Sequence, residues 1–144
     1  MSGERDLRKL LSGMRPELNP GRYVFTHSAG PALPGTPPAH PGPALPGLNP
    51  VVTVAEAEGL TLVVRAEEAD AAGLPYDYTA GWITLRVHSA LAAVGLTAAV
   101  AAELAGAGLS CNVVAGFHHD HLFVPYERAP EALALLRDLA ARSA

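Results

Sequence analysis

The densest group of side chains capable of chemistry is the run His118-His119-Asp120-His121. If a strand begins early in this run, His119 and His121 share one face, because side chains alternate along a strand. Imidazole nitrogens bind zinc, and Asp120 or His88 could supply a further ligand. A closed zinc site takes four ligands, however, and His118 and Asp120 would point away from the pair. A polar hairpin, whose side chains bond to the backbone or face solvent, explains the run better and is the structure we expect.

A few other residues sit where a chemical role can be considered. The single cysteine, Cys111, is predicted on the apolar face of a strand, which is typical of a buried, inert thiol and not of an exposed nucleophile. Glu56 and Glu58 share a strand face like a carboxylate pair, but next to Gly59 at a hairpin end they are typical of a solvated edge. Asn112 lies among apolar residues on a predicted central strand, where asparagine is disfavoured. Its amide would bind a ligand headgroup if it faces an interface, and it needs no such role if it faces solvent.

The elements that would position these residues are clearest after residue 81. The pattern predicts a strand over 82–88, a helix over 95–105, strands over 109–115 and 121–125, and a last helix beginning near Pro130. This β-α-β-β-α order is that of a ferredoxin-like βαββαβ unit without its final strand. The missing strand must therefore come from the N-terminal half or from another subunit.

The N-terminal 50 residues are less regular. Apolar spacing predicts a helix over 3–14 that Pro16 stops, and a turn at Pro20-Gly21 precedes a short strand over 22–26. Residues 29–50 hold eight of the 13 prolines and four of the 14 glycines, with GPALPG occurring twice. Such a composition predicts an exposed polyproline-like loop that packs nothing, although its PxxP spacing also suits an aromatic groove on a partner.

Regular structure is predicted to resume at Pro50. Two β-rich runs on either side of Glu58-Gly59 indicate a hairpin, and residues 66–72 favour a short helix closed by Gly73. Residues 74–81 are expected to form a connector. The predicted strands number six in all, two fewer than two complete four-stranded sheets require.

Length and composition narrow the class of protein. A chain of 144 residues with 49% hydrophobic and 17% charged residues can bury a core without a disulfide or a metal. The net charge of −4 offers no basic surface for nucleic acid. We expect no signal peptide and no membrane span, and therefore a cytoplasmic protein. No P-loop, GxGxxG, HExxH, GxSxG or paired CxxC motif occurs, and no cofactor is expected.

The C-terminal half resembles an ACT domain. Strand residues ITLRV lead through HSALAAVG into LTAAVAAELAGAG, LSCNVVAG resembles the second strand, and HLFVPYERAPEALALLRDL resembles a third strand with its helix. The chain also resembles a group of small, uncharacterised bacterial proteins, in which a half bearing YVF and EAEGLTLVV precedes a half bearing CNVVAGFHHDHLFVP. Only the 29–50 insertion departs from that group.

This resemblance implies an α+β fold of two interlocked ACT-like units with antiparallel sheets and helices on one face. The implied domains are residues 1–80, carrying the 29–50 insertion, and residues 81–144. The implied function is a non-enzymatic regulatory or sensor module that binds a small molecule, an amino acid above all. A homodimer or a separate enzyme would be its partner.

The expected ligand site is the turn from the strand into the helix that follows it. Backbone N–H groups are free at the start of a helix, and together with the helix dipole they favour a carboxylate. Gly95 would permit close approach of a ligand to the backbone, or would simply start the helix. The residues predicted to line the site are His88, Ser89, Val94, Gly95, Leu96, Thr97, Asn112 and Val113.

Two other functions stay open from the sequence. The first is a metal-dependent or acid-base enzyme built on the His118 to His121 hairpin, with His119 and His121 as the metal ligands. The second is an interaction protein that uses sheet edges and the Pro-rich loop to contact a partner.

Overall fold

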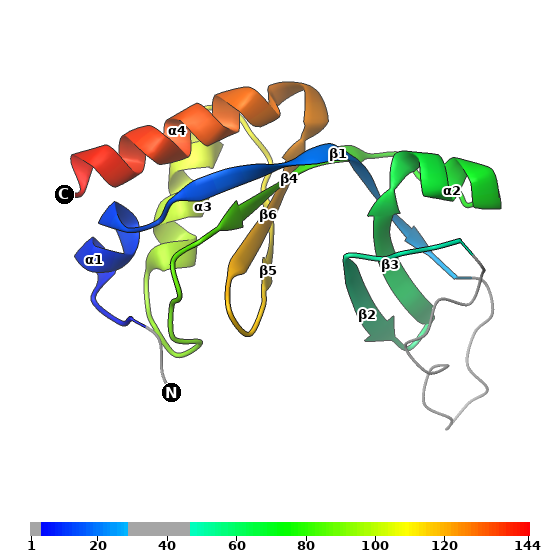
Figure 1. The fold of residues 1–144 in the computed structure, drawn as a ribbon, viewed down its shortest axis with the longest axis horizontal. Coiled ribbons are helices and arrows are strands. Elements are labelled where there is room, and N and C mark those ends of the chain that lie inside the picture. The colour runs from blue at the N-terminus through cyan, green and yellow to red at the C-terminus, as the bar shows by residue number, and fades with distance from the viewer. Residues whose placement is uncertain (1–3, 29–46) are drawn as a thin grey trace. The chain divides into compact units, whose positions relative to one another are not determined.

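The structure is a computed structural model that describes residues 4–28 and 47–144. The chain divides into two compact units. Unit 1 comprises Met1–Pro20 and Ala80–Ala144, and unit 2 comprises Gly21–Thr79. Figure 1 shows the elements of both units. Residues 4–20 thus pack with the C-terminal half, whereas the sequence-based division places them in the first domain. That boundary between the two ACT-like domains stays a prediction.

Unit 1 contains the ferredoxin-like order expected for the C-terminal half. Its elements are α1 (Leu7–Ser12), the beginning of β1 (Pro16–His27), β4 (Thr79–Leu85), α3 (Leu96–Gly106), β5 (Asn112–Ala115), β6 (Asp120–Pro125), the 3-10 turn η1 (Tyr126–Arg128) and α4 (Ala129–Arg142). The strand order is β1-β4-β6-β5, and β6 is antiparallel to both β4 and β5. The strand missing from the C-terminal half therefore comes from the N-terminal half of the same chain, as β1.

Helices cover one face of the unit 1 sheet because each strand turns alternate apolar side chains toward them. Ile83 of β4 pairs with Leu122 of β6, and both are buried against α3 and α4. In α3 the buried residues recur every fourth position, at Leu96, Val100 and Leu104, which is the spacing of one helix face. The other fully buried members of this core are Leu10, Met14, Leu85, Val124, Ala132 and Leu136.

Unit 2 is a smaller antiparallel sheet with one short helix among its described residues. Its elements are the later part of β1, β2 (Val52–Glu56), β3 (Gly59–Arg65) and α2 (Ala66–Ala72), in the strand order β2-β3-β1. Alternate side chains of β1 and β3, including Val24, Leu62 and Val64, pack against α2. Gly73 ends α2 in the left-handed conformation with φ of 68°, as predicted. The predicted hairpin is confirmed by the antiparallel pairing of β2 and β3, and the predicted helix by α2.

Two N-terminal expectations are wrong in their boundaries. The helix predicted over 3–14 begins only at Leu7, because Asp6 caps it by accepting a hydrogen bond from the Lys9 N–H. The predicted turn at Pro20-Gly21 lies inside β1, which runs from Pro16. Gly21 has φ of +107°, so it supplies a backbone bend that other residues rarely adopt and the strand continues past the proline.

The Pro-rich prediction over 29–50 falls mostly on residues outside the described part of the chain. At its C-terminal end, however, the structure corrects it. Leu48 is only 4% exposed and belongs to the core of unit 2, and the N–H of Asn49 donates to Glu68 Oε1 at 2.6 Å. The expectation that the whole segment packs nothing is therefore wrong at Leu48.

The contact between β4 and α4 yields a stability prediction. A Cβ added at Gly81 would lie 2.6 Å from the Cβ of Ala129, which is 2% exposed at the start of α4. We expect Gly81→Ala to lower the free energy of unfolding by about 1–3 kcal/mol, because a packed core tolerates added atoms poorly. Chemical denaturation of the purified variants measures this.

Two further variants test the cause of that loss. Gly106→Ala is the matched control and should be neutral or stabilising, because an added Cβ there would meet no atom within 4 Å apart from the adjoining helix backbone. Combining Gly81→Ala with Ala129→Gly should restore part of the lost stability, because the clashing methyl is removed. Strictly additive effects of the two substitutions would contradict the proposed clash.

Candidate functional site

The loop between β4 and α3 is held in place by the N-terminal segment of the chain. The N–H of Glu4 donates to the His88 carbonyl at 2.9 Å, and the N–H of Ala90 donates to the Glu4 carbonyl at 3.1 Å. Glu4 and Ser89 thereby form a parallel β-bridge. The rest of the loop is open, with Leu91 68% and Val94 83% exposed. The first part of the predicted site is thus fixed backbone and the second part is accessible surface.

The loop ends at a helix start whose backbone donors are unused by side chains. Gly95 precedes α3 with φ of +105°, and no side chain caps the helix. The first N–H groups of α3, from Leu96 onward, have no acceptor within the helix. Leu96 itself is buried in the core, whereas the Thr97 side chain is exposed. The arrangement can accept a carboxylate through N–H groups and the positive end of the helix dipole.

Gly95 has a structural reason to be glycine. Its positive φ disfavours any residue with a Cβ, and an added Cβ would lie 3.1 Å from Leu7 Cδ2 of α1. The group that approaches the Gly95 backbone closely is therefore the Leu7 side chain, where the sequence predicts a ligand. Gly95 thus positions the start of α3 without any ligand.

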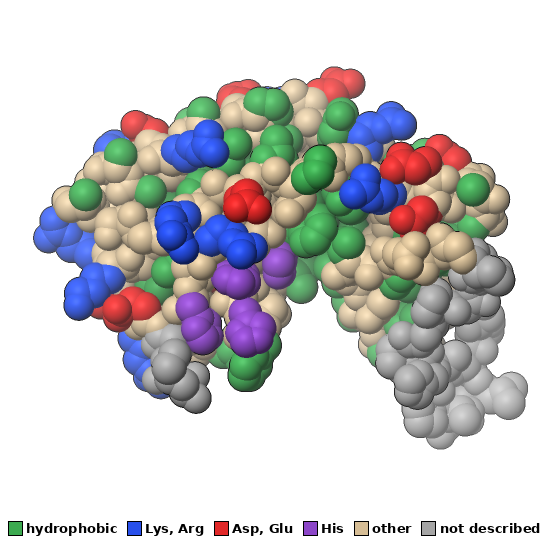
Figure 2. Space-filling model, viewed as in Figure 1, with side chains coloured by type: hydrophobic (Ala, Val, Ile, Leu, Met, Phe, Trp, Pro, Cys, Tyr) green, Lys and Arg blue, Asp and Glu red, His purple; other side chains and the backbone are tan. Residues whose placement is uncertain are grey.

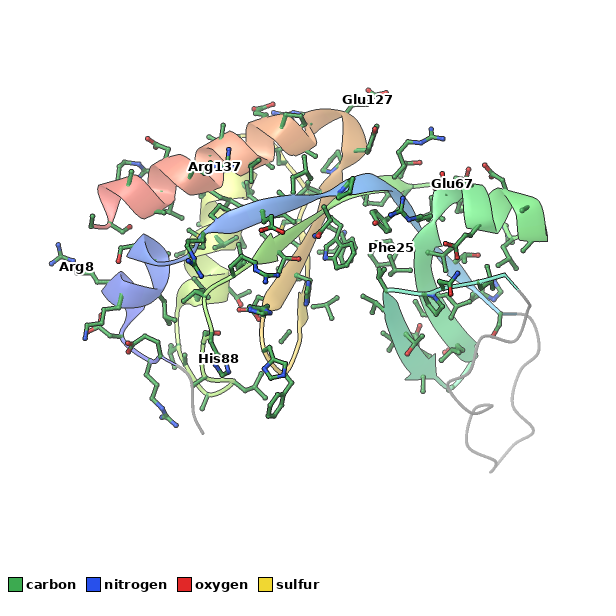
Figure 3. The ribbon with its side chains drawn as sticks, viewed as in Figure 1. Arg8, Phe25, Glu67, His88, Glu127 and Arg137 are labelled. Atoms are coloured by element: carbon green, nitrogen blue, oxygen red, sulfur yellow. The ribbon has the colours of Figure 1, made fainter. Side chains whose placement is uncertain are left out.

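Histidines gather beside this loop, at the turn between β5 and β6 (Figures 2 and 3). The ring centroids of His88 and His118 lie 5.8 Å apart, and those of His118 and His119 lie 6.3 Å apart. Phe117 meets His118 edge-on at 5.0 Å and is 75% exposed. The rings form a contiguous surface of imidazole and phenyl groups rather than a closed ligand cage.

Burial and nearby charges both act on the pKa of His119. Partial burial lowers the pKa of His119, and the nearby positive charges of Arg86 and the neighbouring imidazoles lower it further, against a smaller opposing effect of Asp120. Asp120 also accepts a hydrogen bond from Ser89 Oγ at 3.4 Å. The loop and the first residue of β6 are thus joined by a polar contact at the same end of the sheet.

His121 belongs to a hydrogen-bond network that the sequence did not reveal. Trp82 Nε1 donates to His121 Nδ1 at 3.0 Å, and Thr84 Oγ1 lies 3.2 Å from the same nitrogen. Asn19 Nδ2 donates to Thr84 Oγ1 at 2.9 Å and to the Trp82 carbonyl at 3.2 Å. Because an indole N–H can only donate, Nδ1 of His121 must be the unprotonated acceptor.

The zinc hypothesis for His119 and His121 gains no support from this geometry. Nδ1 of His121 is used by Trp82, and Asp120 is in contact with Ser89. Within residues 4–28 and 47–144, no group of three or more His, Cys, Asp or Glu side chains is arranged to hold a metal ion. The metal-dependent form of the enzyme alternative therefore lacks a set of three ligands among the described residues.

Asn112 and Val113 are not brought to the loop. The strand order places β5 at the edge of the sheet, so the prediction of a central strand for Asn112 is wrong. Asn112 pairs with Phe123, which in turn pairs with Trp82, near the start of β4, whereas the loop leaves the other end of β4 after Leu85. Val113 packs against the core under the helices. The exposed Asn112 amide needs no ligand to explain it.

The remaining candidates are Cys111 in unit 1 and the two glutamates of unit 2. Cys111 is half-buried against the unit 1 core, and burial raises the pKa of its thiol, which disfavours the reactive thiolate. Glu56 and Glu58 are exposed on the hairpin of unit 2, where Glu56 accepts a hydrogen bond from Thr61. They match the solvated edge that we expected.

The network around His121 yields a pH prediction. Burial, followed by the charge of His119 and of Arg86, lowers the pKa of His121, while Asp120 opposes the shift. An unfolded histidine titrates near 6.5, so below about pH 6.5 the unfolded chain binds a proton that the folded chain resists. The stabilisation of the folded state by neutral His121 is fully present above about pH 6.5 and is lost as the pH falls. The reason is that a protonated Nδ1 cannot accept the hydrogen bond from Trp82.

Urea unfolding of wild type and His121→Asn between about pH 5 and 8 tests this. The asparagine side chain offers an oxygen acceptor to the indole N–H but does not titrate. The variant should therefore lose less stability than wild type on acidification. Parallel curves for the two proteins would show that His121 does not cause the pH dependence.

Comparisons with known proteins identify the family. An ACT-domain profile matches residues 2–81, and a second ACT-domain profile matches residues 78–138. No curated protein matches the chain. Among the described residues, no helix is long and apolar enough to cross a membrane.

Solved structures agree in fold. A Vibrio cholerae protein of unknown function, described as a possible transport protein, is 47% identical over 93% of this chain and 95% of its own, with a TM-score of 0.77. An Agrobacterium tumefaciens protein is 19% identical, covers 87% of each chain and has a TM-score of 0.62. The regulatory subunit of aspartate kinase from Thermus thermophilus, at 10% identity, 86% and 95% coverage and a TM-score of 0.52, shares the fold. Two family profiles spanning most of the chain show that it belongs to the ACT-domain family, whose members are regulatory modules that bind small-molecule ligands.

Proposed function

We propose that this protein is a non-enzymatic sensor that binds a free amino acid at the loop between β4 and α3. The observation that carries the proposal is the uncapped start of α3 behind an accessible loop. Family membership supports a regulatory ligand-binding role, and the chemistry of the loop end favours a ligand with a carboxylate.

In this proposal the carboxylate of the amino acid lies on the first N–H groups of α3. The Thr97 hydroxyl is exposed beside them and can donate a further hydrogen bond. No acidic side chain lies in the first turn of α3 to compete for the same donors. The helix dipole adds a favourable interaction of about 0.3–1 kcal/mol at such an exposed position.

The ammonium group of the ligand needs an acceptor at the same end of the sheet. Asp120 supplies one, because its carboxylate already reaches Ser89 of the loop. The ring of His88, half-buried beside His118, forms the adjoining wall. The proposed site therefore keeps His88, Ser89 and the 94–97 segment, and it leaves out Asn112 and Val113.

Exposed apolar side chains surround this end of unit 1. Leu91, Val94 and Phe117 are each more than two-thirds exposed. We propose that they contact the target of regulation, which is a second copy of the chain or a separate enzyme. Sedimentation of the protein with and without the bound amino acid distinguishes a homodimer from a monomer that awaits another partner.

The carboxylate site is tested by removing one backbone donor. Thr97→Pro eliminates the N–H of residue 97 in the first helical turn, where proline is tolerated, as Pro130 shows in α4. The amino acid is first chosen as the one that most raises the melting temperature in a screen of the standard set. We then expect Thr97→Pro to weaken its binding about tenfold in calorimetry, since a hydrogen bond to a charged group contributes about 1.5–3 kcal/mol.

Thr97→Ala is the matched control, because it keeps the backbone N–H and loses only the side chain. It should retain most of the affinity, and both variants should melt within a few degrees of wild type. If no standard amino acid raises the melting temperature, or if Thr97→Pro binds like Thr97→Ala, the proposed site is wrong. Gly95 is unsuitable for this test because its backbone conformation requires glycine.

A further inference from the structure

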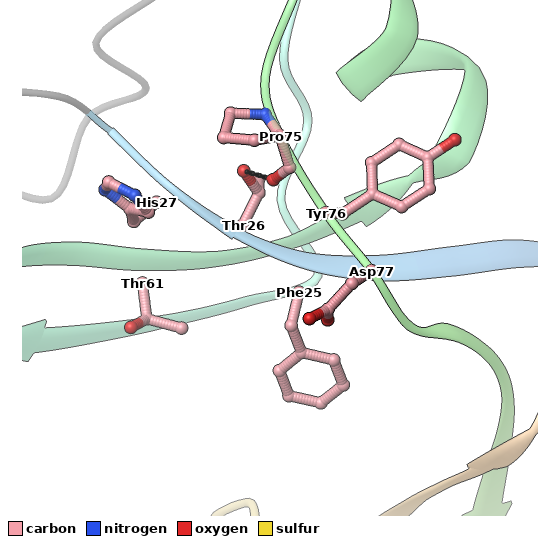
Figure 4. A pocket seen from close by; sticks show the side chains of 7 residues that line it. All are labelled: Phe25, Thr26, His27, Thr61, Pro75, Tyr76 and Asp77. Atoms are coloured by element: carbon pink, nitrogen blue, oxygen red, sulfur yellow. Dashed lines mark hydrogen bonds between the residues drawn. The ribbon is translucent and has the colours of Figure 1, made fainter.

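Unit 2 contains a hollow of its own, lined only by residues of that unit. Its volume is about 580 Å³, which is within the range of small-molecule sites. The last residues of β1 form one side and the segment after α2 forms the other (Figure 4). The lining residues are Phe25, Thr26, His27, Thr61, Pro75, Tyr76 and Asp77.

The walls of this hollow are fastened to regular structure. Thr26 is 6% exposed and its Oγ1 donates to the Pro75 carbonyl at 2.8 Å, which ties the segment after α2 to β1. The Tyr76 hydroxyl donates to Asp70 Oδ1 of α2 at 2.7 Å. Phe25 packs at a tilt against Tyr78, with ring centroids 6.5 Å apart. A ligand would therefore meet walls that are already in position.

An aromatic ring and a carboxylate both line this hollow. Figure 4 shows the Asp77 carboxylate directed toward the Phe25 ring. A second hollow of about 390 Å³ shares His27 and Thr61 with the first and is lined also by Glu56 and Glu58. No Lys or Arg of the described residues lines either hollow. Arg22 lies close enough to act on Tyr76 of the lining, but the carboxylates of Asp77, Glu56 and Glu58 outnumber it, which favours a cation.

We propose that this hollow binds a small organic cation, namely a primary ammonium compound with an aromatic stem. The stem would lie on Phe25 and Pro75, and the ammonium would bind the Asp77 carboxylate beside the ring. An ammonium group near an aromatic face gains a cation–π attraction in addition to the ion pair. This site is independent of the amino-acid site, which lies in unit 1 and favours a carboxylate.

The probe is 2-phenylethylamine, titrated into the full chain by NMR or calorimetry. Its neutral analogue 2-phenylethanol has the same stem without the charge, and phenylalanine adds a carboxylate that Asp77 should repel. A lysine side chain would present the same ammonium group, so Nα-acetyl-lysine amide, which lacks the aromatic stem, is titrated as well. We expect 2-phenylethylamine to bind most tightly and to shift the amide signals of Phe25, Thr26 and Asp77.

Substitutions inside and outside the hollow test which side chains contact 2-phenylethylamine. Asp77 is exposed, so Asp77→Asn should fold normally and weaken binding of 2-phenylethylamine about tenfold. Glu67→Gln removes an exposed acid of the same unit outside the hollow and is the matched control for net charge. Phe25→Leu keeps an apolar side chain but removes the aromatic face, and it should also weaken binding. Thr97→Pro should leave it unchanged, which separates this site from the amino-acid site.

Three outcomes would overturn the proposal. The first is equal affinity for 2-phenylethylamine and 2-phenylethanol, which would show that the charge is not recognised. The second is equal loss of affinity in Asp77→Asn and Glu67→Gln, which would reduce the effect to overall charge. The third is binding of the lysine amide as tight as that of 2-phenylethylamine, which would show that the aromatic stem is not recognised.

Discussion

The placement of β1 beside β4 is the interaction on which unit 1 depends. Residues 80–144 supply three strands and two helices, and without a further neighbour the backbone of β4 would be an open sheet edge. The N-terminal segment closes it. The N–H groups of Arg86 and Val87 donate to the carbonyls of Arg15 and Met14, and the Asn19 side chain bonds to Trp82 and Thr84. Leu10 and Met14, on the same segment, complete the core under the helices.

The same segment also shapes the candidate site. Glu4 holds the backbone of residues 88–90, and Leu7 packs on Gly95, so the loop and the start of α3 are positioned from the N-terminal side. A ligand at this loop would therefore bind to backbone that is already ordered by neighbouring residues. Preorganisation of this kind lowers the entropic cost of binding, which suits a sensor of a small polar ligand.

Local patterns predicted much of the fold. Alternating apolar residues and i, i+4 spacing identified the order from β4 to α4, and Gly73 correctly marked the end of α2. The length of β1 was missed because Pro20-Gly21 has the local chemistry of a turn, and nothing nearby in sequence shows that the strand continues through it. Leu48 was missed because a single leucine among prolines gives no periodic signal.

The candidate site was predictable only in part. The helix start at residues 95–97 follows from local sequence, but the strand that lies beside it depends on sheet order, so Asn112 was assigned to the wrong end of the sheet. The bond between Trp82 and His121 depends on the register of two strands separated by a helix and another strand. The unit 2 hollow is lined by residues of β1 and by residues 75–77, and neither segment carries a motif that predicts a pocket.

The division of β1 between the two units has a consequence for synthesis on the ribosome. Unit 2 ends at Thr79, so it can close as soon as that residue emerges, whereas residues 4–20 must wait for the remaining 65 residues of unit 1, from Ala80 to Ala144. At usual translation speeds this wait lasts roughly 3 to 13 seconds. During that interval Leu10 and Met14 lack the neighbours that bury them fully in the folded protein. The sheet of unit 1 is thus completed late, and α1, which carries Leu10, gains its contact with α4 only after that helix has been made.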